Sequence, residues 1–333
     1  MKIFITGIAG FLGSHLADRM IEFGHEVVGN DTLIGGYLHN VPEKAEFYQI
    51  DCCDMTVMSK AMEGCDVVIH AAATAHEGLS VFSPSFITRN IFEASVSTMT
   101  AAIQNKVKRF VFCSSMARYG NQSNPFLEVN QPTPIDPYAV AKVASEDILK
   151  ILGETHGMEW NIAVPHNIVG PRQRYDDPFR NVMSIMINRN LLGKPSIIYG
   201  DGSQSRCFSY VTDCIVCLEK MALDPNIVYE TINIGPDEET TSILTLANMV
   251  AEELNFPLPP IHMADRPREV KHATCSSDKA RHLLGYKTTT DLKTAIRETA
   301  NYIKHQGAKE FDYSYPVEII SEKTPKTWSE RLM

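Results

Sequence analysis

The sequence predicts an α/β protein built on a doubly wound parallel sheet, with a smaller C-terminal lobe interleaved with it. Short apolar segments alternate with amphipathic ones through the first half of the 333 residues, a pattern typical of a parallel sheet with helices on both faces. The chain starts with a strand-like segment that runs into three spaced glycines. After about residue 170 the alternation stops and the polar segment PRQRYDDPFRN follows.

Five apolar segments predict the strands of this sheet. They are KIFITG, HEVVGND, DVVIHAA, RFVFCSS and NIAVPHNIV, starting at residues 2, 25, 66, 109 and 161. Each is short with an apolar centre, as expected of strands buried on both faces. We therefore expect a nucleotide-binding lobe over residues 1–170, a second lobe over 171–308 and a tail over 309–333 with no obvious place in either.

Composition narrows the class of protein. The net charge of −9 argues against binding to nucleic acid or to an anionic membrane surface. No apolar run approaches the ~20 residues of a membrane span, and a strand at residue 2 leaves no room for a signal peptide, so we expect a cytoplasmic protein. The eight cysteines are scattered, and although Cys214 and Cys217 have a metal-like spacing, no second pair completes a site. No metal is predicted.

The glycine-rich turn after the first strand predicts a dinucleotide site. Gly7, Gly10 and Gly13 stand in the pattern G-x-x-G-x-x-G, with Phe11 and Leu12 between the last two. Glycines here permit a tight turn and a close backbone approach to a pyrophosphate, and the following helix offers free N–H groups at its start. The pattern alone is weak, but its position between a strand and a helix makes it informative.

Two acidic residues extend this prediction to NAD. Asp31 ends the second strand, where a carboxylate accepts hydrogen bonds from both ribose hydroxyls of NAD and repels the 2′-phosphate of NADP. Asp51, in QIDCCD, follows a further short strand expected between HEVVGND and DVVIHAA. Its carboxylate is placed there to accept a hydrogen bond from the adenine amino group. The sequence therefore predicts a Rossmann-type fold with NAD as the cofactor.

A tyrosine and a lysine supply the predicted chemistry. Tyr138 and Lys142 are four residues apart, so on a helix they share one face. An ammonium near a phenol favours the phenolate and lowers its pKa from about 10, which makes the tyrosine a general base for an alcohol. Ser115, at the end of the RFVFC strand, is placed to hydrogen-bond the same substrate oxygen.

These motifs together resemble one family. TGIAGFLG, Asp31, VIHAAA, CSS, YAVAK, PHNIVGPRQ and YGDGSQSRCFSYVTD are similar to the extended short-chain dehydrogenase/reductases, in their nucleotide-sugar epimerase and dehydratase branch, from residue 2 to about 305. The resemblance implies that Ser115, Tyr138 and Lys142 act together on a sugar hydroxyl beside NAD.

The resemblance also implies two sets of binding residues. Those for the nucleotide-sugar are Ser115, Tyr138, Asn167, Asn181, Arg206 and Arg266. Arginine suits a diphosphate because its guanidinium donates two parallel hydrogen bonds to phosphate oxygens. Those for NAD are Gly7, Gly10, Phe11, Leu12, Gly13, Asp31, Asp51, Cys52, Ala71, Ala72, Ala73, Asn90, Tyr138, Lys142 and Pro165.

The segment CSSMARYG favours one reaction of the branch. Sugar 4,6-dehydratases carry an acid pair after the serine, whereas Met116 and Ala117 stand here and neither can transfer a proton. Inversion at C4 through a 4-keto sugar needs no such pair, so we expect an NAD-dependent 4-epimerase acting on a UDP-hexose or its N-acetyl or uronate relative. The alternatives are an NAD(P)-dependent reductase, a dehydratase and a non-catalytic NAD-binding regulator. Arg118 is an unusual residue before the tyrosine of this segment.

The family resemblance further implies a homodimer. Related enzymes pair through two helices per subunit, which correspond here to residues of about 90–104 and 138–153. The other expected partner is the nucleotide-sugar itself, with a UDP-sugar favoured.

Overall fold

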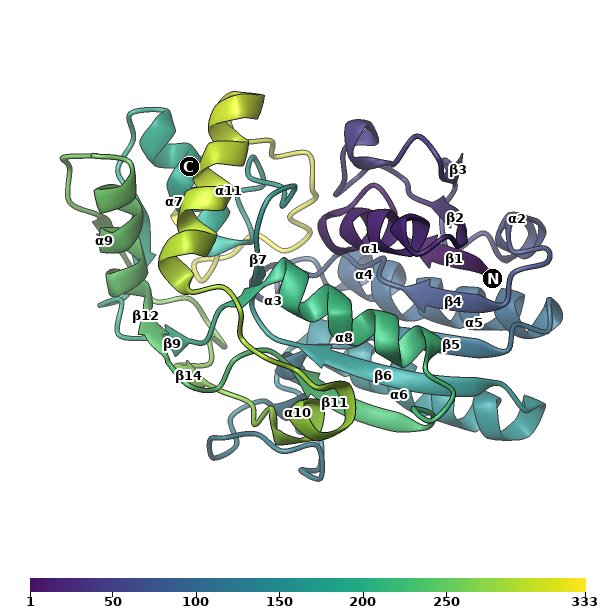
Figure 1. Cartoon of the computed structure of the whole chain (residues 1–333). Coiled ribbons are helices and arrows are strands. Elements are labelled where there is room, and N and C mark those ends of the chain that lie inside the picture. The colour runs from purple at the N-terminus through teal and green to yellow at the C-terminus, as the bar shows by residue number, and fades with distance from the viewer.

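The computed structural model describes all 333 residues and shows a parallel sheet beside a smaller lobe (Figure 1). The sheet has seven strands in the order β11-β6-β5-β4-β1-β2-β3, each parallel to its neighbours. This order is that of a doubly wound fold, so the predicted sheet is confirmed. The strands are β1 (Lys2–Thr6), β2 (Glu26–Asn30), β3 (Glu46–Tyr48), β4 (Val67–His70), β5 (Arg109–Cys113), β6 (Glu159–Pro165) and β11 (Glu230–Ile234).

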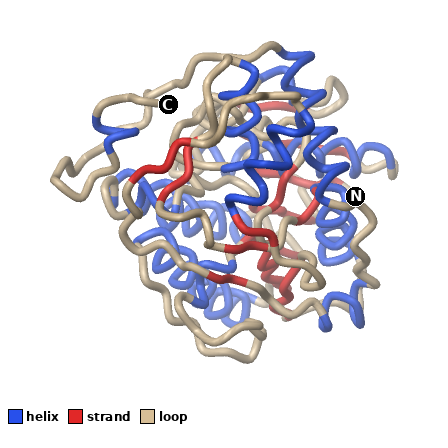
Figure 2. The backbone as a smooth tube through the Cα atoms, turned by 90° about the vertical axis from the view of Figure 1, so that its left-hand side faces the viewer, coloured by secondary structure: helices blue, strands red, loops and turns tan.

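Alternate side chains of each strand enter two separate cores. In β1, Ile3 and Ile5 pack on one face with α1 (Phe11–Glu22), α8 (Val211–Leu223) and α10 (Asp278–Leu284). Phe4 points to the opposite face, where the covering helices are α2 (Met55–Ala61), α5 (Ala94–Gln104) and α6 (Pro137–His156). Burial on both faces explains why apolar residues predominate in these strands. Figure 2 shows the strands enclosed between these helices.

Local sequence fixes the start of α6, on which the predicted tyrosine and lysine lie. Asp136 is the N-cap residue, and its carboxylate accepts a hydrogen bond from the Ala139 backbone N–H at 2.9 Å. Pro137 follows at the first helical position, and the helix ends at Gly157 in the left-handed conformation. Tyr138 therefore stands in the first turn, at the end of the helix that faces the carboxyl edge of the sheet.

The second lobe has its own apolar core around α7 (Val182–Leu191), α9 (Ile243–Glu253) and α11 (Leu292–Gln306). Three small sheets accompany these helices. β7 (Ile168–Val169) pairs with β10 (Ser209–Tyr210), and β8 (Ile197–Tyr199) pairs with β13 (Ile261–Met263). In the third sheet, β9 (Ser205–Arg206) lies between β12 (Thr241–Ser242) and β14 (His272–Ala273). The lobes are interleaved, because β11, α8 and α10 come from the second half of the chain and pack in the first lobe.

Short helices complete the framework. They are η1 (Leu38–Asn40), α3 (Glu77–Ser80), α4 (Pro84–Thr88), η2 (Arg89–Glu93), η3 (Met116–Tyr119) and α12 (Lys326–Ser329). No helix combines the length and the apolar character that crossing a bilayer requires. Cys214 and Cys217 are buried on α8, and the structure has no cluster of three or more His, Cys, Asp or Glu side chains that could hold a metal ion.

The C-terminal tail, residues 309–333, is packed against both lobes. On the sheet side, the Ile319 N–H donates to the Phe82 carbonyl at 2.8 Å, and the Glu318 carboxylate accepts from two backbone N–H groups at the start of α4. On the other side, the Trp328 indole N–H donates to the Pro178 carbonyl at 3.3 Å. The tail therefore bridges the lobes, which its polar sequence did not predict.

Replacing Trp328 should show how much stability the tail contributes. The Trp328 ring is buried against Phe82 and Phe179, so Trp328→Ala should lower the free energy of unfolding by about 3–5 kcal/mol in urea denaturation. Ile320→Ala is the matched control, because Ile320 is 71% exposed in the same tail, and its effect should stay below about 0.5 kcal/mol. Equal effects of the two substitutions would show that the tail is not packed.

Candidate functional site

One cavity at the carboxyl edge of the sheet brings together every binding and catalytic residue that the sequence predicts. It opens between the two lobes, where the ends of β1, β2, β4, β5 and β6 face α7 and β9. Ligands of doubly wound sheets bind at this edge. The predicted residues that line the cavity are Gly7, Gly10, Phe11, Leu12, Gly13, Asp31, Asp51, Cys52, Ala71, Ala72, Ala73, Asn90, Ser115, Tyr138, Lys142, Pro165, Asn167, Asn181, Arg206 and Arg266.

The glycine turn leaves no room for side chains. Gly7 has a φ of 71°, and a Cβ there would lie 2.9 Å from the Ala72 Cα. A Cβ on Gly13 would lie 2.1 Å from the Gly7 carbonyl oxygen, so α1 packs directly on the turn. The N-cap of α1 is Gly10, which has no side chain to bond the free N–H groups of the first turn. These N–H groups stay available to a pyrophosphate.

Acidic and amide side chains line the rest of this half of the cavity. Asp31 is 8% exposed and accepts hydrogen bonds from the N–H groups of Ala9 at 3.1 Å and Leu33 at 2.7 Å. Burial raises the pKa of Asp31, and these hydrogen bonds oppose the shift. Asp51 forms an ion pair with Arg89 at 3.1 Å. The bare glycine turn and the acidic residue at the end of β2 fit NAD, and Cys52 and Asn90 lie in the wall beside them.

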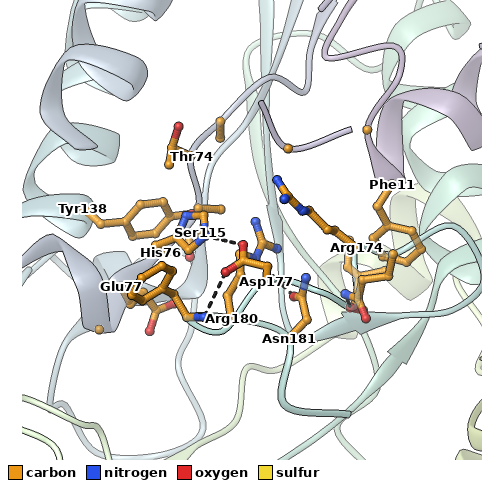
Figure 3. A pocket seen from close by; sticks show the side chains of 18 of the residues that line it. Phe11, Thr74, His76, Glu77, Ser115, Tyr138, Arg174, Asp177, Arg180 and Asn181 are labelled. Atoms are coloured by element: carbon orange, nitrogen blue, oxygen red, sulfur yellow. Dashed lines mark hydrogen bonds and ion pairs between the residues drawn. The ribbon is translucent and has the colours of Figure 1, made fainter. Parts of the chain in front are cut away.

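Ser115 and Tyr138 lie close together in the cavity (Figure 3), and Lys142 lines the same cavity one helical turn after Tyr138. Tyr138 is 4% exposed and Lys142 2% exposed. The Lys142 ammonium donates to the Cys113 carbonyl at 2.7 Å and lies 5.9 Å from the centroid of the Tyr138 ring. Burial lowers the pKa of Lys142 to about 8.

The pKa of Tyr138 moves against the prediction. Lys142 was expected to lower it, but burial of the phenol raises it, and the nearby Glu77 carboxylate raises it further. A hydrogen bond with Ser115 acts in the opposite direction without offsetting burial. The prediction was wrong because it counted the ammonium and left out desolvation, which for a buried phenol is the larger effect.

The unusual Arg118 turns away from the cavity. Its guanidinium forms a buried ion pair with Glu146 of α6 at 2.8 Å, and the Ser114 hydroxyl donates to the same carboxyl group. Met116 and Ala117 are also buried and do not line the cavity. The segment after Ser115 therefore supplies no acid to the site, and Arg118 stabilises the packing of α6 behind it.

The opposite half of the cavity carries two arginines. Arg206 donates to the backbone carbonyls of Ser205, Val270 and Lys271. These partners are neutral, so Arg206 has no carboxylate partner within 4 Å. Burial lowers the pKa of Arg206. Arg266 pairs with Glu269 at 2.7 Å.

Two asparagines lie in the same half. The Asn167 amide donates to the Cys207 carbonyl at 3.0 Å, and Asn181 is the N-cap residue of α7 with a φ of 68°. Asn181 also accepts a hydrogen bond from the Arg180 Nε at 3.2 Å. The concentration of guanidinium and amide donors on this wall suits a diphosphate.

Sequence analysis missed several residues of the cavity. Glu77 and Arg180 face the cavity near Tyr138, and Figure 3 labels all three residues. Tyr315 and Met333 enter the cavity from the tail. His76 and Asp177, which also line the cavity, form a buried pair at 2.6 Å. The loop after VIHAAA was a detectable signal for Glu77, because loops at the carboxyl ends of parallel strands line such sites. Nothing in the sequence marked the tail residues.

The fold and this cavity define an NAD-binding enzyme of the Rossmann type. The sequence model of the NAD dependent epimerase/dehydratase family matches residues 3–235, and the chain belongs to this family. The predicted resemblance is therefore confirmed.

Individual relatives cover nearly the whole chain. The uncharacterized UDP-glucose epimerase YtcB of Bacillus subtilis is 30% identical over 91% of this chain and 98% of its own. The crystal structure of UDP-glucose 4-epimerase with UDP-glucose from Thermotoga maritima has a TM-score of 0.86 at 28% identity, covering 92% of this chain and 99% of that one. UDP-glucuronic acid 4-epimerase from Bacillus cereus, in complex with UDP-glucuronic acid and NAD, has a TM-score of 0.85 at 29% identity, covering 92% and 100%.

Replacing Asp31 should change the choice of cofactor. Asp31→Ser removes the buried carboxylate that repels a 2′-phosphate, so the ratio of NAD to NADP affinity should fall by about tenfold or more. Isothermal titration with each dinucleotide measures the ratio. Glu43→Ser, at an exposed position, is the control and should leave it unchanged. An unchanged ratio in Asp31→Ser would remove Asp31 from the site.

Replacing Lys142 should reveal the cost of burying an ammonium. The pKa of Lys142 is about 8 in the folded protein against an ordinary 10.5, so between these values the unfolded chain binds more protons and folding stability rises with pH. Relative to Lys142→Met, the wild type should gain about 2–3 kcal/mol in the free energy of unfolding between pH 7 and pH 10. Urea denaturation at both pH values tests this, and a difference that does not depend on pH would contradict it.

Proposed function

We propose that this protein is an NAD-dependent nucleotide-sugar 4-epimerase that acts through a transient 4-keto sugar. The observation that carries the proposal is the position of Ser115, Tyr138 and Lys142 between a dinucleotide site and an arginine-lined wall, with Met116 and Ala117 in place of an acid pair. The substrate is a UDP-hexose, a UDP-N-acetylhexosamine or a UDP-hexuronate. The relatives support this class, since two of them are structures with UDP-glucose and with UDP-glucuronic acid.

The chain's own residues position the sugar and transfer its hydroxyl proton. Arg206 and Arg266 bind the diphosphate and so direct the sugar towards Tyr138. Tyr138, acting as the phenolate, takes the proton of the C4 hydroxyl and becomes the phenol, while Ser115 hydrogen-bonds the same oxygen. The phenol gives this proton back after the ring has turned over. NAD, held by the glycine turn and Asp31, would supply a reversible acceptor for the C4 hydride.

Lys142 sets the protonation state of Tyr138. The phenol must lose its proton to solvent before it can act as a base, and desolvation and Glu77 both oppose this loss because they raise its pKa. The Lys142 ammonium acts in the opposite direction and favours the phenolate. A pKa of about 8 leaves Lys142 mostly charged at neutral pH, so its ammonium attracts the Tyr138 phenolate when substrate binds.

The site argues against the related reactions. A dehydratase needs an acid and a base near C5 and C6, and the segment after Ser115 provides neither. A reductase generally uses NADPH, which the Asp31 carboxylate disfavours. A non-catalytic regulator has no need to bury Lys142, which costs folding stability at neutral pH.

We further propose the domain division and the homodimer that the sequence predicts. The dinucleotide lobe covers residues 1–170, the substrate lobe 171–308 and the tail 309–333.

A shallow groove lies on the outer face of α6, lined by Phe92, Ile135, Val140 and Ala144 among others, and Val140 is 51% exposed. An apolar helix face of this kind supports pairing of two copies through η2–α5 and α6.

Product analysis tests the proposed reaction. Incubation with NAD and, separately, UDP-glucose, UDP-N-acetylglucosamine and UDP-glucuronate should give a C4-inverted sugar by proton NMR for at least one substrate, without net NADH. Tyr138→Phe should lower kcat by about 10²-fold or more while NAD still binds. Tyr229→Phe, at an exposed tyrosine, is the matched control.

Three results would contradict the proposal. Stoichiometric oxidation or reduction of the cofactor would indicate an oxidoreductase. A 4-keto-6-deoxy product would indicate a dehydratase whose acid lies outside CSSMARYG. Bound NAD and bound UDP-sugar with no turnover would indicate a regulator.

A further inference from the structure

Glu77 lies along the part of the cavity that a sugar must fill. It is the first residue of α3, directly after the loop at the carboxyl end of β4, and its side chain is exposed to the cavity near Tyr138 (Figure 3). The next residue, Gly78, is so close to Arg266 that an added Cβ would lie 3.6 Å from its Nη1. Glu77 is therefore between the proton-transfer residue and a phosphate-binding arginine. A hexose spans the same interval, with C4 at Tyr138 and its diphosphate at the arginines.

Arg206 and Arg266 both act on Glu77, but once a diphosphate compensates these two arginines the remaining charges around this interval are in negative excess. Three carboxylates surround it: Glu77, the helix cap Asp136 and the buried Asp177. The two cations that remain are Lys142 and Arg180. Lys142 lies beside Tyr138, and the charge of Arg180 lowers the pKa values of Glu77, Tyr138 and Asp177. The Glu77 side chain lines the cavity and forms no ion pair within 4 Å; burial raises its pKa, and Arg206, Arg266 and Arg180 oppose this shift.

The other arginines of the wall are committed elsewhere. Arg174 is held by Asp176 at 2.9 Å and by Asp312 of the tail at 2.6 Å, so it has no free charge for a ligand. Arg206 and Arg266 are the predicted diphosphate ligands. Arg180 alone remains to compensate a negative charge on the sugar, and Glu77 and Asp177 already share it.

We propose that Glu77 makes the site select neutral sugars, hexoses or N-acetylhexosamines, over hexuronates. The inference rests on the proposed function and narrows its substrate class. A carboxylate at C6 would add a like charge within a few ångströms of Glu77, in a cavity shielded from solvent. The two carboxylates must then repel each other or one must take up a proton, and either outcome weakens binding.

Binding measurements on the NAD-loaded protein test this selection. Isothermal titration with UDP-glucose, UDP-glucuronate and UDP separates the sugar from the nucleotide. The wild type should bind UDP-glucose at least about tenfold more tightly than UDP-glucuronate. Equal affinities, or tighter binding of UDP-glucuronate, would overturn the inference.

Two variants of opposite sign make the test specific. Glu77→Gln keeps the shape and hydrogen-bonding capacity of the side chain but removes its charge, so the preference for UDP-glucose should fall by about tenfold. Arg180→Gln removes the compensating cation and should increase the preference. Glu77→Gln should raise the affinity for UDP and for both UDP-sugars through the two diphosphate arginines, so the ratio of the UDP-sugar affinities isolates the effect on the sugar. Failure of the two variants to shift the ratio in opposite directions would also overturn the inference.

The two proposals fail in different ways. If the affinity ratios shift as expected but no UDP-sugar is inverted at C4, the epimerase assignment falls and the role of Glu77 stands. If UDP-glucose is inverted at C4 and the ratios do not respond to Glu77→Gln, the epimerase assignment stands and the role of Glu77 falls.

Discussion

The close contact between the first turn and the first helix is the constraint on which the rest of the site depends. Gly13 lies so near the Gly7 carbonyl that no side chain fits, and a Cβ on Gly7 would lie 2.9 Å from the Cα of Ala72, just after β4. These contacts fix the start of α1 and the carboxyl ends of β1 and β4 relative to one another. Because all seven strands are parallel, the ends of β2, β5 and β6 open on the same edge, and each adds one wall to the cavity.

The same edge concentrates charges whose burial costs stability. Lys142 is held in an almost solvent-free position by one backbone carbonyl, and Arg206 by three, without a carboxylate partner for either. A protein selected for stability alone would pair these cations or expose them. Their retention is understandable if each cation faces a negative charge in the working site, a substrate diphosphate at Arg206 and the Tyr138 phenolate near Lys142.

Much of the fold and the cavity could be predicted because the signals are local. The strand KIFIT, the glycine turn and the Tyr138–Lys142 spacing each encode their structure within a few residues, and parallel topology then brings them to one edge. The features that could not be predicted depend on distant contacts. Arg118 is explained by Glu146, 28 positions further along the chain, and the tail is positioned by carbonyl and amide groups of two lobes. The pKa of Tyr138 depends on total burial, which no short motif encodes.

The burial of the last residue limits how the chain can be handled. Met333 is 8% exposed, packs with Ile185 and Ile197 of the second lobe and lines the cavity. A purification tag, fluorescent protein or linker joined after Met333 would start from inside this wall and displace it. Met1 is 52% exposed at the opposite end of the first strand from the glycine turn. Fusions intended to preserve the site therefore belong at the N-terminus.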